Sequence, residues 1–110
     1  MSEESRTERF APDVAMTRND ALHQYELRVA DTLAVRVKFR DLPGHVDLIH
    51  TETQAGFEGK GLAKVLGRYA LDDVVASGKR IIPHCPFINR FIRNHPDDYD
   101  QYTDFPEDAA

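Results

Sequence analysis

The 110 residues are 41% hydrophobic and 30% charged, and their formal net charge is −5. This is the size and composition of a single soluble globular domain, and the acidic balance argues against general nucleic-acid binding, which needs a basic face. No apolar run approaches the roughly 20 residues that span a bilayer, and the single cysteine, Cys85, excludes an internal disulfide.

The two ends of the chain lack the periodic patterns of its middle. Residues 1–19 show no hydrophobic period and are predicted to form a flexible N-terminal arm, with a short pairing segment near Phe10 to Val14. Residues 1–9 are polar and mixed in charge, which is not typical of a signal peptide. Residues 101–110 are acidic, and we expect a C-terminal tail that wraps the surface or frays. The folded domain is therefore expected over residues 20–100.

Three consecutive segments alternate apolar and polar residues, which is the pattern of half-buried strands. They cover residues 23–29, 33–40 and 46–51. The turns between them are short, so we expect an antiparallel meander. Within the third segment, His50 is predicted to lie on the same face as Val46 and Leu48.

The hydrophobic period then changes from two to about 3.6 residues. Apolar residues recur at helical spacing from Leu62 to Val74, and Gly78 supplies a C-cap. Residues 80–84 form a short apolar strand, and Pro86 suits the first position of a second helix. The order is β-β-β-α-β-α, and a right-handed crossover makes the last strand parallel to the third. This pattern indicates an α+β fold with a mixed, mostly antiparallel sheet.

The turn before the first helix is the most informative segment, Glu58-Gly59-Lys60-Gly61-Leu62-Ala63-Lys64. Its two glycines permit a tight turn with no side chain over the amides, and the first amides of a helix carry partial positive charge. Lys60 and Lys64 add full charges, so the segment predicts an anion site, most often for phosphate. It matches neither a P-loop nor a dinucleotide fingerprint, and an ordinary turn is the alternative.

This loop resembles the acyl-CoA pyrophosphate loop of the GCN5-related N-acetyltransferases, whose pattern is Gln/Arg-x-x-Gly-x-Gly/Ala. Gly61 and Ala63 fit the pattern, and Glu58 departs from it. Four further motifs extend the resemblance, over about residues 20–100, to the small members called minimal acetyltransferases. They are Leu48-Ile49-His50-Thr51-Glu52, Ala70-Leu71-Asp72, Pro83-His84-Cys85-Pro86-Phe87 and Ile92-Arg93-Asn94-His95-Pro96.

The resemblance implies a slot for acetyl-CoA where the third and fourth predicted strands separate. Backbone groups there would bond the pantetheine, and Asn89 in the second helix would face the same arm. The pyrophosphate would lie on the glycine loop. The residues implied are, for the strand, His50, Thr51, Glu52 and Thr53, and for the loop, Glu58, Gly59, Lys60, Gly61, Leu62, Ala63 and Lys64.

Three side chains are candidates for the chemistry. His50 and Glu52 share one face of their strand, and either could take the proton that an attacking ammonium must lose. The alternative is a hydrogen-bonded core histidine and a rim carboxylate. Cys85 lies beside His84 and a helix N-terminus, which permits an acyl-cysteine route. The alternatives for Cys85 are an auxiliary role in direct transfer and simple burial as an apolar residue.

No metal is expected, because His50, His84, Cys85 and His95 lack the paired spacing of zinc ligands. The resemblance implies a truncated acyl-CoA N-acyltransferase fold that moves an acetyl group from acetyl-CoA to an amine of unknown identity, small or carried by a protein. We expect a cytoplasmic monomer or weak dimer with no nucleic-acid or membrane partner. The alternatives are a non-catalytic acyl-CoA-binding sensor or partner protein, and a domain whose loop binds another anion or merely turns.

Overall fold

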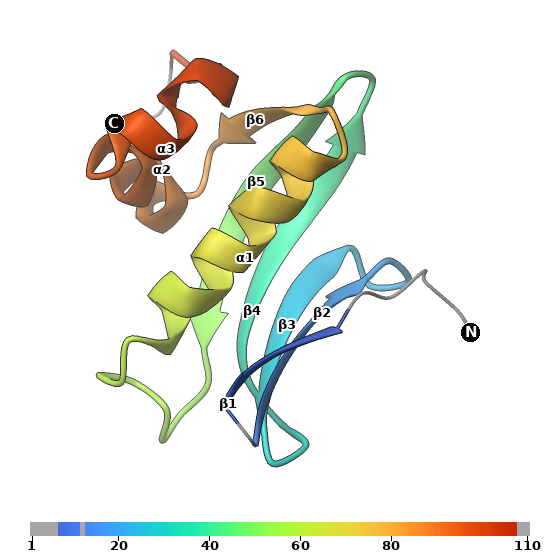
Figure 1. Cartoon of the computed structure of the whole chain (residues 1–110), viewed down its shortest axis with the longest axis vertical. Coiled ribbons are helices and arrows are strands. Elements are labelled where there is room, and N and C mark those ends of the chain that lie inside the picture. The colour runs from blue at the N-terminus through green and yellow to red at the C-terminus, as the bar shows by residue number, and fades with distance from the viewer. Residues whose placement is uncertain (1–6, 12, 108–110) are drawn as a thin grey trace.

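The computed structural model describes residues 7–11 and 13–107, and side chains from Asp13 onwards. A six-stranded sheet runs in sequence order, with one long helix across it and shorter helices beside its last strand (Figure 1). The strands are β1 Thr7–Ala11, β2 Val14–Asn19, β3 Gln24–Val29, β4 Thr32–Leu42, β5 His45–Thr53 and β6 Arg80–Pro83. The helices are α1 Leu62–Ala76, α2 Pro86–Arg93 and α3 Pro96–Tyr99, followed by a 3-10 turn at Asp100–Tyr102.

The predicted β-β-β-α-β-α order is confirmed from β3 to α2, and the sheet is mixed as expected, with β6 parallel to β5 and the other pairs antiparallel. The predicted flexible arm over residues 1–19 is wrong for β1 and β2, which form a hairpin that pairs with β3. Val14 and Met16 alternate with less buried neighbours and are themselves buried. That short alternation was the available signal. Residues 1–6 and 12 lie outside the described part of the chain.

Helix α1 packs its apolar stripe on one face of the sheet. Leu66, Ala70 and Val74 are fully buried. The Tyr25 hydroxyl of β3 donates a hydrogen bond to the Asp73 carboxylate of α1 at 2.8 Å. Burial raises the pKa of Tyr25 to about 12, although the charge of Arg18 opposes this. The phenol therefore keeps its proton, and this bond, at neutral pH.

A β-bulge at Ile49 interrupts the alternation of β5. Lys38 of β4 pairs with His50, whereas the next residue, Phe39, pairs with Leu48, so Ile49 is the extra residue. His50 therefore lies on the opposite face from Val46 and Leu48, and the prediction that placed the three together is wrong. The sequence did not reveal the inserted residue, because the apparent period of two continues through it.

The bulge gives the sheet two chemically different faces. Residues directly opposite each other in an antiparallel pair share a face, so Val35, Val37 and Phe39 lie on the α1 side with Thr51 and Leu48. We call the other side the polar face. Its side chains on β3, β4 and β5 are Gln24, Glu26, Arg36, Lys38, Arg40, Asp47, His50 and Glu52.

The segment after α2 closes the outer edge of β6. The Asp104 amide donates to the Ile81 carbonyl at 2.8 Å, and Thr103 forms a bridge with Ile81. Tyr99 is buried, and its hydroxyl donates to Asp72 at 2.6 Å. The predicted C-terminal tail therefore wraps the surface as far as Asp104.

Asp104 gives this wrapping a pH dependence. Hydrogen bonds from Arg80 and from His45 lower the pKa of its carboxyl group from 3.8 to about 2. A lowered carboxyl pKa stabilises the fold above about pH 4, and the contribution is lost as the pH falls through about 2.

Asp104→Asn should lower the unfolding temperature at pH 7, and the difference from the wild type should shrink towards pH 2. Thermal unfolding followed by circular dichroism measures it, with the exposed Asp97→Asn as control; an equal difference at both pH values would contradict the assignment.

Candidate functional site

The site lies where β5 and β6 part. Their parallel pairing runs to Leu48 and Pro83, and the Cys85 amide donates to the Leu48 carbonyl at 2.8 Å. Pro86 has no N–H to continue the ladder and begins α2. Residues 50–53 of β5 therefore keep their register with β4, while the described register with β6 has ended. A strand edge of this kind accepts an extended ligand through main-chain hydrogen bonds.

A cavity of about 190 Å³ adjoins the end of β5. Seven of the residues predicted to hold the cofactor line it, namely Thr53, Glu58, Gly59, Gly61, Leu62, Ala63 and Lys64. The sequence did not single out Phe57 and Phe87 for this site, and they provide its aromatic walls. Phe57 immediately precedes the glycine loop, and Phe87 follows the proline that begins α2. These positions next to two predicted turns were the signal in the sequence that could have placed both rings at the site.

The glycine loop has the geometry of an anion site. Gly59 and Gly61 have φ of 77° and 76°, a backbone conformation that side-chain-bearing residues rarely adopt. Gly61 is the N-cap of α1 and has no side chain to bond the first helical amides. The Val65 amide makes the first intrahelical bond, to the Gly61 carbonyl at 3.3 Å. The first turn holds no acidic residue and carries Lys64, so the positive end of the helix faces the cavity.

Glu58 is turned back on its own loop. Its carboxylate accepts a hydrogen bond from the Gly56 amide at 3.0 Å. This contact closes the preceding turn and occupies one carboxylate oxygen. The Glu58 side chain therefore helps to fix the conformation of its own loop.

His50 and Glu52 share one face of β5, as predicted, and the structure shows that this is the polar face. Neither residue lines the 190 Å³ cavity. Glu52 forms an ion pair with Arg36 at 2.6 Å. His50 is exposed and lies directly across from Lys38. Both candidates therefore have a cationic neighbour on β4.

Cys85 is only 2% exposed, and its sulfur lies 3.2 Å from the Thr51 hydroxyl oxygen. Thr51 is on the α1 side of β5, opposite Val37. Cys85 and His50 therefore approach β5 from opposite faces, although both lie beside the point where the strands part. Their assignment to the chemistry stays a prediction.

The amide of Asn89 is used inside the fold. Its side chain is buried, with Nδ2 donating to the Pro83 carbonyl at 3.2 Å and Oδ1 accepting from Arg93 Nε at 2.7 Å. These bonds hold the start of α2 against the end of β6. A contact between Asn89 and the cofactor stays a prediction, as does the one for Lys60, which is exposed in the loop.

The sequence did not predict one cluster of hydrogen-bonded polar side chains at the site. Asp47 of β5 is fully buried, and its carboxylate accepts hydrogen bonds from Arg40 at 2.8 Å and from His84 Nδ1 at 2.8 Å. The sequence indicated His84 as a neighbour of Cys85 and as an excluded zinc ligand, whereas in the structure it bonds Asp47 on the polar face. An aspartate in the middle of an apolar strand was the signal, because such a carboxylate needs buried partners.

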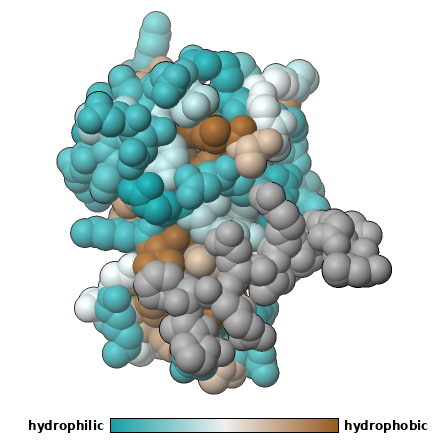
Figure 2. Space-filling view, in the orientation of Figure 1, coloured by the Kyte–Doolittle hydropathy of each residue, from teal (hydrophilic) through white to brown (hydrophobic). Residues whose placement is uncertain are grey.

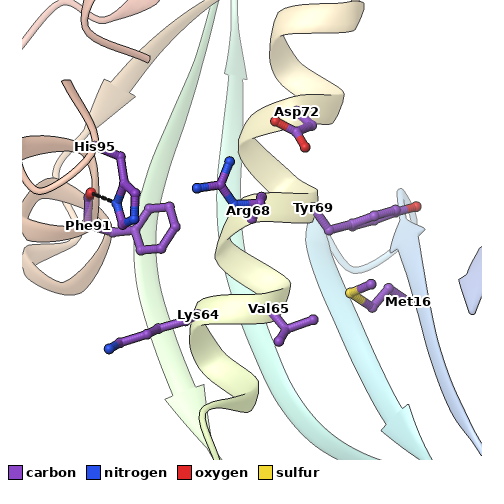
Figure 3. A pocket seen from close by; sticks show the side chains of 8 residues that line it. All are labelled: Met16, Lys64, Val65, Arg68, Tyr69, Asp72, Phe91 and His95. Atoms are coloured by element: carbon purple, nitrogen blue, oxygen red, sulfur yellow. Dashed lines mark hydrogen bonds between the residues drawn. The ribbon is translucent and has the colours of Figure 1, made fainter. Parts of the chain in front are cut away.

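A second, open cavity of about 460 Å³ lies over the outer surface of α1. Phe91 and His95 border it on the α2 side, Met16 on the β2 side, and Lys64 and Arg68 project from α1 between them (Figure 3). Lys64, in the first turn of α1, lines both cavities. On the face shown in Figure 2, the atoms that are not grey belong mostly to hydrophilic residues, with small hydrophobic patches.

Among the described residues, no group of three or more His, Cys, Asp and Glu side chains is arranged to hold a metal ion. In the same part of the chain, none of the helices has both the length and the apolarity that a bilayer crossing requires.

The fold is shared with a known enzyme. A ribosomal-protein-alanine N-acetyltransferase from Brucella melitensis biovar Abortus 2308 superposes with a TM-score of 0.53 over 92% of this chain and 71% of its own, at 19% sequence identity. The sheet, the parted strands and the loop at the start of α1 therefore define an acyl-CoA N-acyltransferase fold. The family model for the GCN5-related N-acetyl-transferase matches residues 24–102, and the chain belongs to this family. The predicted resemblance is thus confirmed, and membership supports acyl transfer as the general activity.

Curated relatives match over a shorter stretch. Protein NATD1 of Bos taurus is 41% identical over 51 residues, which are 46% of this chain and 45% of that protein. Protein NATD1 of Homo sapiens is 37% identical over 51 residues, with the same coverage of both chains. The match spans less than half the length of these relatives.

The buried Asp47 should matter more for stability than the partly exposed Glu52. Asp47→Asn removes the negative charge that accepts hydrogen bonds from Arg40 and His84, and we expect a loss of about 1–3 kcal/mol in the free energy of unfolding. Glu52→Gln removes a partly exposed ion pair and should cost less than about 1 kcal/mol. Urea denaturation of both variants at pH 7 measures the difference. Equal losses would show that the Asp47 cluster does not support the fold.

Proposed function

We propose that this protein transfers an acetyl group from acetyl-CoA to an amine. The observation that carries the proposal is the cavity at the start of α1. It is lined both by the glycine loop, where the helix has no side-chain cap, and by Thr53 at the end of the β5 edge that β6 has left. An anion site and an open strand edge side by side suit a ligand with a pyrophosphate and an amide-containing arm.

The cofactor would lie along this path from the loop to Leu48. Its pyrophosphate would meet the amides from Gly59 to Lys64, with the charges of Lys60 and Lys64 adding to the attraction. Its pantetheine would bond main-chain groups between His50 and Thr53. A backbone N–H of β5 would polarise the thioester carbonyl.

The acceptor amine would approach from the polar face. His50 and Glu52 lie there, beyond the bulge and next to the parted strands, so we keep both as candidate contacts for the amine. Catalysis would come chiefly from holding amine and thioester together. We favour direct transfer, because Cys85 is buried, bonded to Thr51 and on the opposite side of β5.

The first test is thermal unfolding with acetyl-CoA, CoA or ATP. A ligand that binds only the folded state stabilises it by RT ln(1 + [L]/Kd), about 2.7 kcal/mol at 100 times Kd. We expect acetyl-CoA and CoA to raise the unfolding temperature, and we expect ATP to leave it unchanged. No shift at millimolar ligand would overturn the cofactor assignment. A shift without turnover of any amine would instead favour a non-catalytic acyl-CoA-binding protein.

Gly61→Glu should abolish that shift. The new carboxylate would stand at the helix N-terminus where the pyrophosphate is proposed to bind, and would repel it. Gly56→Glu is the matched control, since Gly56 also has a positive φ of 93° and does not line the cavity. Both variants should lose similar stability from backbone strain, and only Gly61→Glu should lose CoA binding, measured by calorimetry. Retained binding by Gly61→Glu would contradict the loop assignment.

A further inference from the structure

Two cationic side chains follow each other along α1 from the start of the helix. Lys64 lines both the cavity beside the glycine loop and the cavity of about 460 Å³ over α1, and Arg68 lines the larger one. The two residues are four positions apart, which places them on the same face of the helix. Both side chains project towards the α2 side of the larger cavity (Figure 3). The Lys64 ammonium group is therefore within reach of ligands in either cavity.

The charge of Lys64 has no acidic partner in the part of the chain whose side chains are described. Its ammonium group makes no hydrogen bond or ion pair there, and the residue is exposed. Arg68 donates to the Tyr99 hydroxyl at 3.1 Å and pairs with Asp98 at 3.2 Å, with both charged side chains almost half exposed. Like charges four residues apart on a helix repel each other, so an anion bound between Lys64 and Arg68 would remove this repulsion.

The charged groups that line the larger cavity change sign along α1. Asp72 also lines it and lies eight residues beyond Lys64, about 12 Å further along the helix axis. Its carboxylate accepts a hydrogen bond from the Tyr99 hydroxyl at 2.6 Å. At the other end, the helix terminus has no side-chain cap and adds its partial positive charge to that of Lys64. An anionic group in this cavity is therefore attracted towards Lys64 and Arg68 and away from Asp72.

The α2 side of the cavity places flat rings beside these cations. The ring centroids of Phe91 and His95 are 4.3 Å apart, and His95 Nδ1 donates to the Phe91 carbonyl at 2.8 Å, which fixes the imidazole ring. The Arg68 guanidinium carbon lies 5.5 Å from the centroid of the Phe91 ring. Aromatic surface next to positive charge suits a planar base that carries a phosphate.

We propose that Lys64 and Arg68 bind the 3′-phosphate of CoA and that the adenosine of the cofactor occupies the cavity over α1. The inference rests on the proposed acetyl-CoA site and deepens it by placing the part of the cofactor that lies beyond the pyrophosphate. CoA carries this third phosphate on its ribose, whereas ATP shares only the adenosine diphosphate part. The two cations therefore help the site to distinguish CoA from ATP.

Calorimetric titration of the full chain with CoA and with 3′-dephospho-CoA tests the proposal. The wild type should bind CoA about 10-fold or more tightly, because charge-assisted hydrogen bonds to the 3′-phosphate form only with CoA. Adenosine 3′,5′-bisphosphate should compete with CoA, and ATP at the same concentration should not. Equal affinities for CoA and dephospho-CoA would overturn the 3′-phosphate site and leave the proposed function intact. Binding of neither ligand would overturn the cofactor assignment, and this inference with it.

Substitution of each cation separates its contacts with the different phosphates. Arg68→Gln should weaken the binding of CoA and leave that of dephospho-CoA unchanged, so the preference between them falls. Arg68→Lys keeps the charge, should retain most of the preference, and serves if Arg68→Gln does not fold. Lys64→Gln should weaken both ligands, because Lys64 also lines the cavity proposed for the pyrophosphate, and should weaken CoA more. Equal weakening by Lys64→Gln, or an unchanged preference in Arg68→Gln, would contradict the role assigned to that residue.

Lys79→Gln is the matched control for the loss of one positive charge. Lys79 lies beyond the C-terminal end of α1, where it pairs with Asp41 at 3.6 Å, and it lines neither cavity. This variant should bind both ligands with the wild-type affinities. A loss of the preference for CoA as large as in Arg68→Gln would show that the preference follows net charge, and would overturn the site.

Discussion

The hydrogen bond from the Cys85 amide to the Leu48 carbonyl ends the pairing between β5 and β6 among the described residues. Proline follows immediately, so the ladder cannot continue and the chain turns into α2. Asn89 then fixes the start of that helix to Pro83. The open edge of β5, the cavity beside the glycine loop and the position of Cys85 all follow from this one interruption.

The bulge at Ile49 decides which side chains of β5 lie on each face of the sheet beside the parted strands. Without the bulge, β5 would alternate regularly through Ile49, so His50 would lie on the α1 side with Leu48, and Thr51 would lie on the polar face. With it, the apolar packing under α1 continues through Thr51 to Cys85, and His50 and Glu52 join the polar face. In the proposed reaction this separates the two substrates, because the cofactor occupies the parted edge and the amine comes from the polar side.

Although the protein is acidic overall, its charged side chains form local pairs on the polar face, and positive groups lie beside the cavity. On the polar face, Arg36 and Arg40 are paired with Glu52 and Asp47. At the loop, the positive helix terminus and Lys64 face the cavity, and Glu58 is held by the Gly56 amide. The net charge of −5 therefore says little about the ligand, since the local field at each site is set by a few neighbouring groups.

The sequence by itself determined the fold from β3 to α2, because strong alternation, one long helical stripe and the glycine and proline punctuation all agree there. It also located the loop, since the pattern around Gly61 requires only local geometry. In place of the β1–β2 hairpin it predicted only a short pairing segment near Phe10 to Val14, because both strands are short and the alternation of β2 covers few residues. Only the tertiary structure decided the face of His50, because a bulge leaves no mark in the alternation. The partnership of Asp47 with His84 and Arg40 likewise depends on three strands meeting, and residues 37 positions apart give no sign of contact in a single sequence.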